Sequence, residues 1–305
     1  MNAAEPAAEA PPQPTPRDWA FLLALIVMWG SAFAAIRIAV GEVSPSLVVF
    51  GRLSLGAGLL TGYALVRGRR FPPLTDLRWL WFFALGLTGN AIPFSLISWA
   101  QTSAPSSVAG VFMALVPLLT IGLAHVFVPG EQATRRKIMG FALGFTGLMI
   151  LLAPGAAAGF VDAPLGPQLA LLAAASSYAV SGILAKRAPE TSPSVIATAM
   201  LSCGALATAP LAAPDLAQMA QASPQTWVMI VALGAFPTAI ASILYVQVVR
   251  RVGPSFLSLT NYFVPLWAVG MGALVFAEPL PATLLGALTV ILIGLVIARP
   301  KTAKQ

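Results

Sequence analysis

The chain has 305 residues, of which 58% are hydrophobic and only 9% are charged. A soluble domain carries about 25% charged residues, so this composition excludes a soluble globular protein and requires lipid around the chain. The net charge of +7 does not indicate nucleic-acid binding, because the basic residues stand in short clusters between apolar stretches and not on one folded face.

Ten apolar stretches follow one another along the chain, and most are long enough to cross a bilayer. A hydrocarbon core about 30 Å thick is spanned by about 20 helical residues. The two shortest stretches are 138–153 and 281–298. The predicted transmembrane helices are 18–40, 46–66, 77–99, 105–127, 138–153, 164–185, 193–213, 225–249, 254–276 and 281–298.

Basic residues mark alternate gaps between these stretches. Of the 17 Lys and Arg residues, 15 lie before the first stretch or after an even-numbered one, and the other gaps contain none. By the positive-inside rule the basic gaps are cytoplasmic. Both ends of the chain are therefore predicted to be cytoplasmic.

The chain also repeats itself with a shift of 148 residues. Residues 44–45 (Ser-Pro) recur at 192–193, and 116–118 (Val-Pro-Leu) recur at 264–266. Each half holds five stretches, an odd number, so equivalent helices are predicted to run in opposite directions across the membrane. Such inverted repeats are the usual build of secondary transporters, whose substrate site lies near mid-membrane where the halves meet.

The predicted fold is an all-α membrane protein made of two inverted five-helix repeats. We predict the first repeat at 17–153 and the second at 163–299. Residues 1–16 are rich in Ala and Pro and lack the basic segment that begins a secretory signal, so they are predicted to be a disordered cytoplasmic tail. Residues 300–305 are predicted to form a second cytoplasmic tail.

The two halves resemble the EamA-type repeats of the drug/metabolite transporter superfamily. The residues that carry the resemblance are Trp29-Gly30-Ser31, Phe33, Arg52, the Val-Pro-Leu at 116–118 and 264–266, Gly130-Glu131 and Ala277-Glu278. The resemblance covers about 18–299. It implies ten helices, cytoplasmic termini and a central cavity lined mainly by helices 1, 3, 4, 6, 8 and 9. It also implies export of amino acids or related metabolites, as in exporters of the YddG type.

Two basic residues, Arg37 and Arg52, are not among those assigned to the cytoplasmic gaps. Arg37 is near the outer end of its helix, so it is predicted to reach the outer surface or to pair with Glu42. Arg52 is deeper and is predicted to point inward, either toward helix carbonyls or into an outward vestibule. The second half has Ser177 in place of Trp29 and Met200 in place of Arg52, so the predicted cavity is not chemically symmetric.

Paired irregularities at equivalent positions of the two halves indicate a transporter site. Asn90 stands near the middle of its stretch, and its equivalent in the second half is Thr238. Gly and Pro beside these residues permit helix bends. The predicted hinges or gates are Gly89, Pro117, Pro237 and Pro265. The alternative for the prolines is a kink that serves helix packing alone.

A zwitterionic amino acid needs donors for its carboxylate and acceptors for its ammonium group, and a broad aromatic cavity tolerates varied side chains. Aromatic residues with polar tips, together with Asn and Gln, meet these needs. The predicted substrate-binding residues are Trp29, Arg52, Asn90, Ser98, Trp99, Tyr178, Tyr245, Gln247, Asn261 and Tyr262. The alternative for the aromatic residues is a belt at the membrane interface.

Carboxylates are absent from the middle of every predicted helix, and the sole histidine, His125, lies near the cytoplasmic end of its helix. Proton-driven pumps typically carry an ionisable group inside the membrane. We therefore predict facilitated, uncoupled transport. The sequence contains no P-loop pattern, and a single cysteine, Cys203, cannot form a Cys-based zinc site. No cofactor, metal or catalytic residue is expected.

The predicted function is that of a secondary transporter that exports amino acids, aromatic and other, or related small metabolites by alternating access. The alternatives within transport are a sugar-phosphate or nucleotide-sugar exchanger and a drug efflux transporter. Alternatives from other classes are a membrane-embedded enzyme and a non-transporting scaffold. The predicted partners are a small-molecule substrate and the lipid bilayer, with no nucleic acid, and the predicted location is a bacterial inner membrane. The sequence does not distinguish lipid-facing from partner-facing apolar surfaces, so it predicts no oligomeric state.

Overall fold

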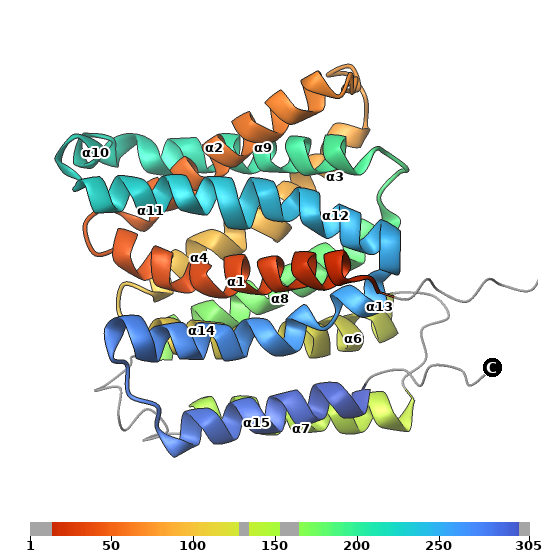
Figure 1. Cartoon of the computed structure of the whole chain (residues 1–305), viewed down its shortest axis with the longest axis vertical. Helices are drawn as coiled ribbons and strands as arrows, with labels where there is room; N and C mark the ends of the chain where they lie inside the picture. Colours follow the sequence, from red (N-terminus) through yellow and green to blue (C-terminus); the bar gives the residue numbers. More distant parts are fainter. Residues whose placement is uncertain (1–13, 128–133, 153–164, 299–305) are drawn as a thin grey trace, which may run out of the picture.

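The computed structural model describes residues 14–127, 134–152 and 165–298, and every regular element within these ranges is a helix (Figure 1). Seven helical segments are long and apolar enough to cross a membrane. They are Pro16–Ala39, Pro45–Val66, Arg78–Ala100, Ser106–Phe127, Leu165–Arg187, Pro193–Asp215 and Pro224–Val252. Two shorter apolar helices, Thr260–Phe276 and Ala282–Ala298, follow them. The chain is therefore an all-helical, multi-pass membrane protein.

The first half begins with two uninterrupted helices and continues with two broken ones. Its elements are α1 (Pro16–Ala39), α2 (Pro45–Val66), α3 (Arg78–Gly86), the π-helix η1 (Leu87–Ala91), α4 (Ile92–Ala100), α5 (Ser106–Met113), α6 (Val116–Phe127) and α7 (Arg135–Leu152). The break between α5 and α6 precedes Pro117, which has no N–H to donate to the carbonyl of Met113.

The second half repeats this order. Its elements are α8 (Leu165–Arg187), α9 (Pro193–Ala212), the 3-10 turn η2 (Ala213–Asp215), α10 (Ala217–Gln221), α11 (Pro224–Gly234), the π-helix η3 (Ala235–Ile240), α12 (Ala241–Val252), α13 (Pro254–Leu257), α14 (Thr260–Phe276) and α15 (Ala282–Ala298). The π-helices η1 and η3 begin at 87 and 235, which differ by the 148 residues of the sequence repeat. Both halves therefore widen the helix at the same place.

The helices lie side by side with similar axis directions, and α7 pairs with α15 at one edge of the bundle (Figure 1). Elsewhere α2 packs along α9 and α4 along α8. Close approach depends on small residues, as is usual in membrane bundles. A Cβ on Gly86 would lie 2.4 Å from the carbonyl oxygen of Met200, and one on the equivalent Gly234 would lie 3.0 Å from that of Arg52. The same glycine contact thus recurs in both halves.

The largest apolar core joins the two halves, because it draws buried side chains from both. Phe112 on α5, Leu171 on α8 and Ile291 on α15 are fully buried members. A second cluster packs Leu53 and Leu60 of α2 against α9 and the π-helical segments. Within the described ranges, the two halves therefore share these cores across the seam.

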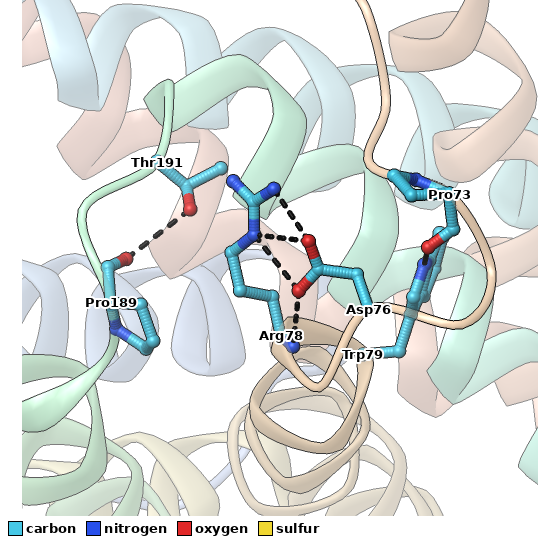
Figure 2. A network of polar contacts seen from close by, with 6 residues as sticks. All are labelled: Pro73, Asp76, Arg78, Trp79, Pro189 and Thr191. Atoms are coloured by element: carbon cyan, nitrogen blue, oxygen red, sulfur yellow. Dashed lines mark hydrogen bonds and ion pairs between the residues drawn. The ribbon is translucent and has the colours of Figure 1, made fainter.

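Short polar contacts fix the helix ends. The guanidinium of Arg78, at the start of α3, pairs with the carboxylate of Asp76 at 2.7 Å, and the Trp79 indole donates to the Pro73 carbonyl at 3.1 Å. Figure 2 shows this network beside a turn in which the Thr191 hydroxyl donates to the Pro189 carbonyl. The first two contacts join the loop before α3 to the start of that helix, and the third lies within the connection between α8 and α9.

At the opposite helix ends, Glu42 and Arg37 have different partners from those expected. The Glu42 carboxylate accepts hydrogen bonds from the backbone N–H of Ser223 at 2.9 Å and the Thr226 hydroxyl at 2.8 Å. Arg37 donates to the carbonyls of Gln101 and Ala104 at 2.8 and 2.9 Å. The predicted pairing of Arg37 with Glu42 is therefore wrong, because the chain reversal between α4 and α5 presents free carbonyls closer to the arginine.

Some sequence expectations fall beyond the part of the chain that the structure describes. They are residues 1–13 of the first predicted tail, the last predicted tail 300–305, and the Gly130-Glu131 junction. The second junction, Ala277-Glu278, is described. Glu278 accepts hydrogen bonds from the backbone N–H groups of Ser106 and Ser107 at 2.8 and 2.9 Å, which caps the start of α5.

Candidate substrate site between the repeats

The two π-helices lie at the seam between the halves, and each is held by the first helix of the other half. The Trp29 indole on α1 donates to the carbonyl of Pro237 in η3 at 3.2 Å. The Ser177 hydroxyl on α8 donates to the carbonyl of Thr88 in η1 at 2.8 Å. Trp29 and Ser177 are equivalent residues of the repeat. Because π turns leave backbone groups outside the regular helical pattern and often mark functional sites, this reciprocal contact defines the candidate site.

Arg52 on α2 points into this seam, as predicted. Its side chain is only 5% exposed. Its Nε donates to the Thr238 hydroxyl at 2.8 Å, and its guanidinium carbon lies 3.7 Å from the centre of the Phe94 ring. Neither expected environment, helix carbonyls or an outward vestibule, is the one observed. The arginine is instead satisfied by a hydroxyl of η3 and by a cation–π contact with α4.

Asn90 is the equivalent of Thr238, but its surroundings differ. The Asn90 side chain is 7% exposed, and its Nδ2 has no hydrogen-bond partner among the described residues. The position equivalent to Arg52 holds Met200, whose thioether is only a weak acceptor. A buried donor without a partner costs about 1–3 kcal/mol. The first half therefore presents a free amide donor at the point where the second half presents an occupied hydroxyl.

Two pairs of aromatic rings lie at the seam, since Trp29 contacts η3 and Phe94 contacts Arg52. Trp29 and Tyr245 lie with their ring centres 6.4 Å apart, and Phe94 and Tyr178 lie 6.5 Å apart. The rings come from α1, α12, α4 and α8, so both halves contribute. The structure thus places the following predicted residues at or beside the seam: Trp29, Arg52, Gly89, Asn90, Tyr178, Pro237 and Tyr245.

Gly89 allows α8 to approach η1 closely. A Cβ at this position would lie 2.6 Å from the Ser181 hydroxyl oxygen. Pro117 and Pro265 are not part of the π-helices: Pro117 is at the start of α6, and Pro265 is buried inside α14. The two pairs of hinge candidates therefore lie on different helices.

The other predicted binding residues are not gathered around Asn90 by any contact in the described structure. Gln247 lines a separate cavity of about 150 Å³. Trp99 is half exposed, and its ring tip lies 3.5 Å from the Cβ position of Gly166 at the start of α8. Ser98 is fully buried in α4, and Tyr262 packs against the largest core. Asn261 is half-buried in α14.

Sequence reasoning did not identify two contributors to the seam. Phe94, which stacks under Arg52, is not among the predicted binding residues, and the sequence marks Ser177 only as a departure from Trp29. Phe94 stands four residues after Asn90, a spacing that places both side chains on one face of a regular helix. That spacing is the signal that would have found it. The hydrogen bond of Ser177 could not be found in this way, because it depends on the carbonyl geometry of the π turn.

The fold and the seam define an integral membrane protein of the duplicated transporter class. The chain belongs to the EamA-like transporter family, whose pattern matches residues 18–153 and again 166–299. This confirms the predicted membership of the drug/metabolite transporter superfamily and of its EamA type.

Several known proteins are similar over most of their length. An inner membrane transporter of Escherichia coli strain K12, YedA, whose name describes it as uncharacterized, is 30% identical over 82% of this chain and 80% of its own. A probable terminal-alkyne amino-acid exporter of Streptantibioticus cattleyicolor is 27% identical over 88% of each chain. The aromatic amino acid exporter YddG of Ancylobacter novellus is 27% identical over 79% of this chain and 82% of its own.

A solved crystal structure shows the same fold, with a TM-score of 0.62 and 22% identity over 92% of this chain and 96% of the other. At this identity the likeness concerns the fold alone. Together the relatives and the apolar helices confirm a multi-pass inner-membrane protein that acts as a transporter.

Proposed function

We propose that the chain exports amino acids, aromatic and other, or closely related small metabolites across the inner membrane. The observation that carries the proposal is the buried Asn90 amide, which has a donor without a partner at the seam between the two repeats. The names of two relatives, one an aromatic amino acid exporter and one a probable amino-acid exporter, support the same substrate class.

The chemistry of the seam suits a zwitterion with a hydrophobic side chain. Asn90 offers a donor to a carboxylate, and the buried charge of Arg52 adds a positive field. The faces of Trp29 and Tyr245 attract an ammonium group and pack against an apolar side chain. Few polar anchors among many apolar surfaces allow side chains of different size to bind.

The proposed mechanism is alternating access between two inverted five-helix repeats, 17–153 and 163–299, with both chain ends in the cytoplasm. The halves would rock against each other about the seam. The contacts Trp29–Pro237 and Ser177–Thr88 link opposite halves, so they are the bonds expected to exchange during rocking. We propose downhill, uncoupled movement, because Arg52 is the one charged side chain buried at the seam among the described residues.

Exchange of sugar phosphates or nucleotide sugars is the second candidate in the superfamily, and drug efflux is a third. A phosphate group requires several buried cations. Within the described ranges only Arg52 is a buried arginine, while Arg37 is bound to two carbonyls. These contacts favour a substrate with a single negative group over a phosphate ester.

The test is efflux from loaded proteoliposomes with a panel of radiolabelled amino acids, a sugar phosphate and a cationic dye. We expect amino acids, aromatic ones included, to leave faster than from protein-free vesicles. Trp29→Phe removes the indole donor to Pro237. Efflux should slow roughly tenfold, as expected when transport requires this hydrogen bond and the bond is lost.

The matched control is Trp79→Phe, which removes an indole hydrogen bond of 3.1 Å in the loop before α3, away from the seam. It should retain the wild-type rate. Efflux of the sugar phosphate or the dye without that of amino acids would contradict the proposed substrate class. Equal rates for both tryptophan variants would contradict the proposed position of the site.

A further inference from the structure

A cavity of about 150 Å³ opens between α2, α9 and α12, away from the Asn90 amide. Its basic residues are Arg67, Arg69 and Arg250, and all three are exposed. Arg67 and Arg69 follow the end of α2, and Arg250 lies in the last turn of α12. None of the three has a carboxylate partner among the described residues. The guanidinium of Arg67 lies 5.5 Å from the centre of the Tyr63 ring, which also lines the cavity. The cavity is therefore a concentration of unpaired positive charge.

The remaining lining is divided between polar and apolar groups. The hydroxyls of Ser192 and Ser194 lie 3.1 Å apart at the start of α9, where the helix dipole adds partial positive charge. Leu60, Ala197 and Ile243 form an apolar wall that belongs to the second core cluster. A ligand that satisfies both parts must be an amphipathic anion.

We propose that this cavity binds the headgroup of an acidic phospholipid. The three arginines lie in gaps that the positive-inside rule assigns to the cytoplasm, so the cavity faces the leaflet whose acidic lipids attract such residues. Basic pockets between membrane helices are known sites for acidic headgroups. The volume equals about five water molecules, enough for a phosphate and adjoining glycerol atoms. A free inorganic anion would leave the apolar wall unused.

The site is separate from the proposed substrate site but linked to it by α12. Ser242 lines the cavity, and its hydroxyl donates to the carbonyl of Thr238 at 2.6 Å. Thr238 in turn accepts the hydrogen bond of Arg52. A lipid that binds the folded protein and not the unfolded chain stabilises the folded protein, so headgroup binding can be measured by thermal unfolding without any transported substrate.

The test measures the thermal unfolding midpoint of the full chain in neutral detergent during titration with dioleoyl phosphatidylglycerol. The decisive variant is the double substitution Arg67→Gln with Arg250→Gln. Its matched control is Arg70→Gln with Arg136→Gln, which removes the same charge at exposed residues that do not line the cavity. A second double variant, Arg67→Lys with Arg250→Lys, retains the charge.

We expect phosphatidylglycerol to raise the midpoint of the wild type, the control and the lysine variant at similar concentrations. The Arg67→Gln, Arg250→Gln protein should need roughly 30-fold more lipid, because each basic residue near an acidic surface contributes about a fivefold preference. Because these side chains are exposed, the variant should unfold at the wild-type temperature before lipid is added.

Four outcomes would overturn the proposal. They are an equal response to phosphatidylcholine, an equal response to inorganic phosphate alone, an equal loss in the Arg70→Gln, Arg136→Gln control, and no response to phosphatidylglycerol. An equal loss in the control would show a diffuse effect of surface charge. An equal response to inorganic phosphate would show a site for free anions. None of these outcomes bears on amino-acid efflux, which is tested at Trp29.

Discussion

At the scale of single residues, the seam is asymmetric because equivalent residues of the two halves differ chemically. In the second half's π-helix, Thr238 holds the buried Arg52 through a hydrogen bond of 2.8 Å. In the first half's π-helix, the equivalent Asn90 has Met200 at the arginine's equivalent position, and its Nδ2 is left without a partner. The second half's π-helix thus makes a polar contact with Arg52, while the equivalent position of the first half's π-helix has a donor without a partner.

The free donor gives a prediction that separates function from stability. Asn90→Leu removes a buried amide that has no partner and replaces it with an apolar group of similar size. The unfolding midpoint should stay the same or rise, because the cost of about 1–3 kcal/mol for the unpaired donor disappears. Amino-acid efflux should fall roughly tenfold or more, since the substrate carboxylate loses its donor.

The control for this prediction is Thr238→Val, which leaves Arg52 Nε without its acceptor. Here the unfolding midpoint should fall, because hydrogen bonds to charged groups contribute about 1.5–3 kcal/mol. Thermal unfolding in detergent and efflux from vesicles measure the two properties. If Asn90→Leu lowered the midpoint and left efflux unchanged, Asn90 would be a packing residue.

Glu42 gives a second prediction at this scale, which concerns pH. The backbone N–H of Ser223, followed by the Thr226 and Ser223 hydroxyls, holds the pKa of the Glu42 carboxyl below its usual range. A lowered pKa in the folded state means that the carboxylate stabilises the protein above its unfolded pKa of about 4.3, and that this contribution disappears as the pH falls through the folded value.

The unfolding midpoint of the wild type should therefore decrease as the pH is lowered from about 7 to about 3. The midpoint of the Glu42→Gln variant should decrease by less, because this variant lacks the titrating group. Glu190→Gln removes the same charge at the equivalent, exposed position of the second half, so it should keep the wild-type pH dependence. Identical pH profiles for all three proteins would show that Glu42 does not contribute to the pH dependence.

At the scale of elements, glycine contacts decide how closely the helices pack. A Cβ on Gly86 would lie 2.4 Å from the backbone oxygen of Met200, so α3 and α9 would have to separate. Gly58 on α2 has nothing within 4 Å of its Cβ position. Gly86→Ala should therefore lower the unfolding midpoint by an amount corresponding to about 1–3 kcal/mol, the usual cost of overpacking.

Gly58→Ala should leave the unfolding midpoint unchanged or raise it, because alanine favours a helix by up to about 1 kcal/mol over glycine. The comparison uses thermal unfolding of both variants in one detergent. Equal losses of stability would mean that α3 and α9 are not in contact at Gly86.

The positions of the helices could be predicted, but their interruptions could not. The predicted 193–213 agrees with α9 (Pro193–Ala212), because the Ser-Pro start and the length of the apolar stretch are both local signals. The π turn at Leu87–Ala91 was indicated only as an irregularity near Gly89 and Asn90. The carbonyl of Thr88 accepts a hydrogen bond from Ser177 of the other half. The periodicity of the sequence cannot predict such a distant partner.

Prediction of the site was limited by the same distant contacts. Tyr245 and Gln247 are both predicted to bind substrate because of their hydrogen-bonding tips, yet residues two apart on a helix point to different sides. Tyr245 faces Trp29, while Gln247 lines the basic cavity. The buried positions of Asn90 and Arg52 could be predicted, since a polar residue inside an apolar helix is a strong signal in itself.

At the scale of the whole molecule, uncoupled transport predicts insensitivity to a proton gradient. Amino-acid uptake into proteoliposomes should reach the same final level, with no accumulation above equilibrium, for pH gradients of either sign. The physical reason is that, among the described residues, no buried acid lies at the seam with Arg52, Thr238 and Asn90. The buried Asp18 is at the start of α1, where it pairs with Arg251. Accumulation that follows the imposed gradient would refute this mechanism.

We propose that two equivalent five-helix repeats are inserted in opposite directions and meet at the π-helices. Gly41 and Pro189 are equivalent exposed positions of the two halves. With the buried native Cys203 replaced by alanine, Gly41→Cys and Pro189→Cys can each be labelled in intact cells with a membrane-impermeant maleimide. We predict labelling of Gly41→Cys from outside, and labelling of Pro189→Cys only after the membrane is permeabilised. Labelling of both positions from the same side would contradict the inverted arrangement, and with it the proposed passage between the repeats.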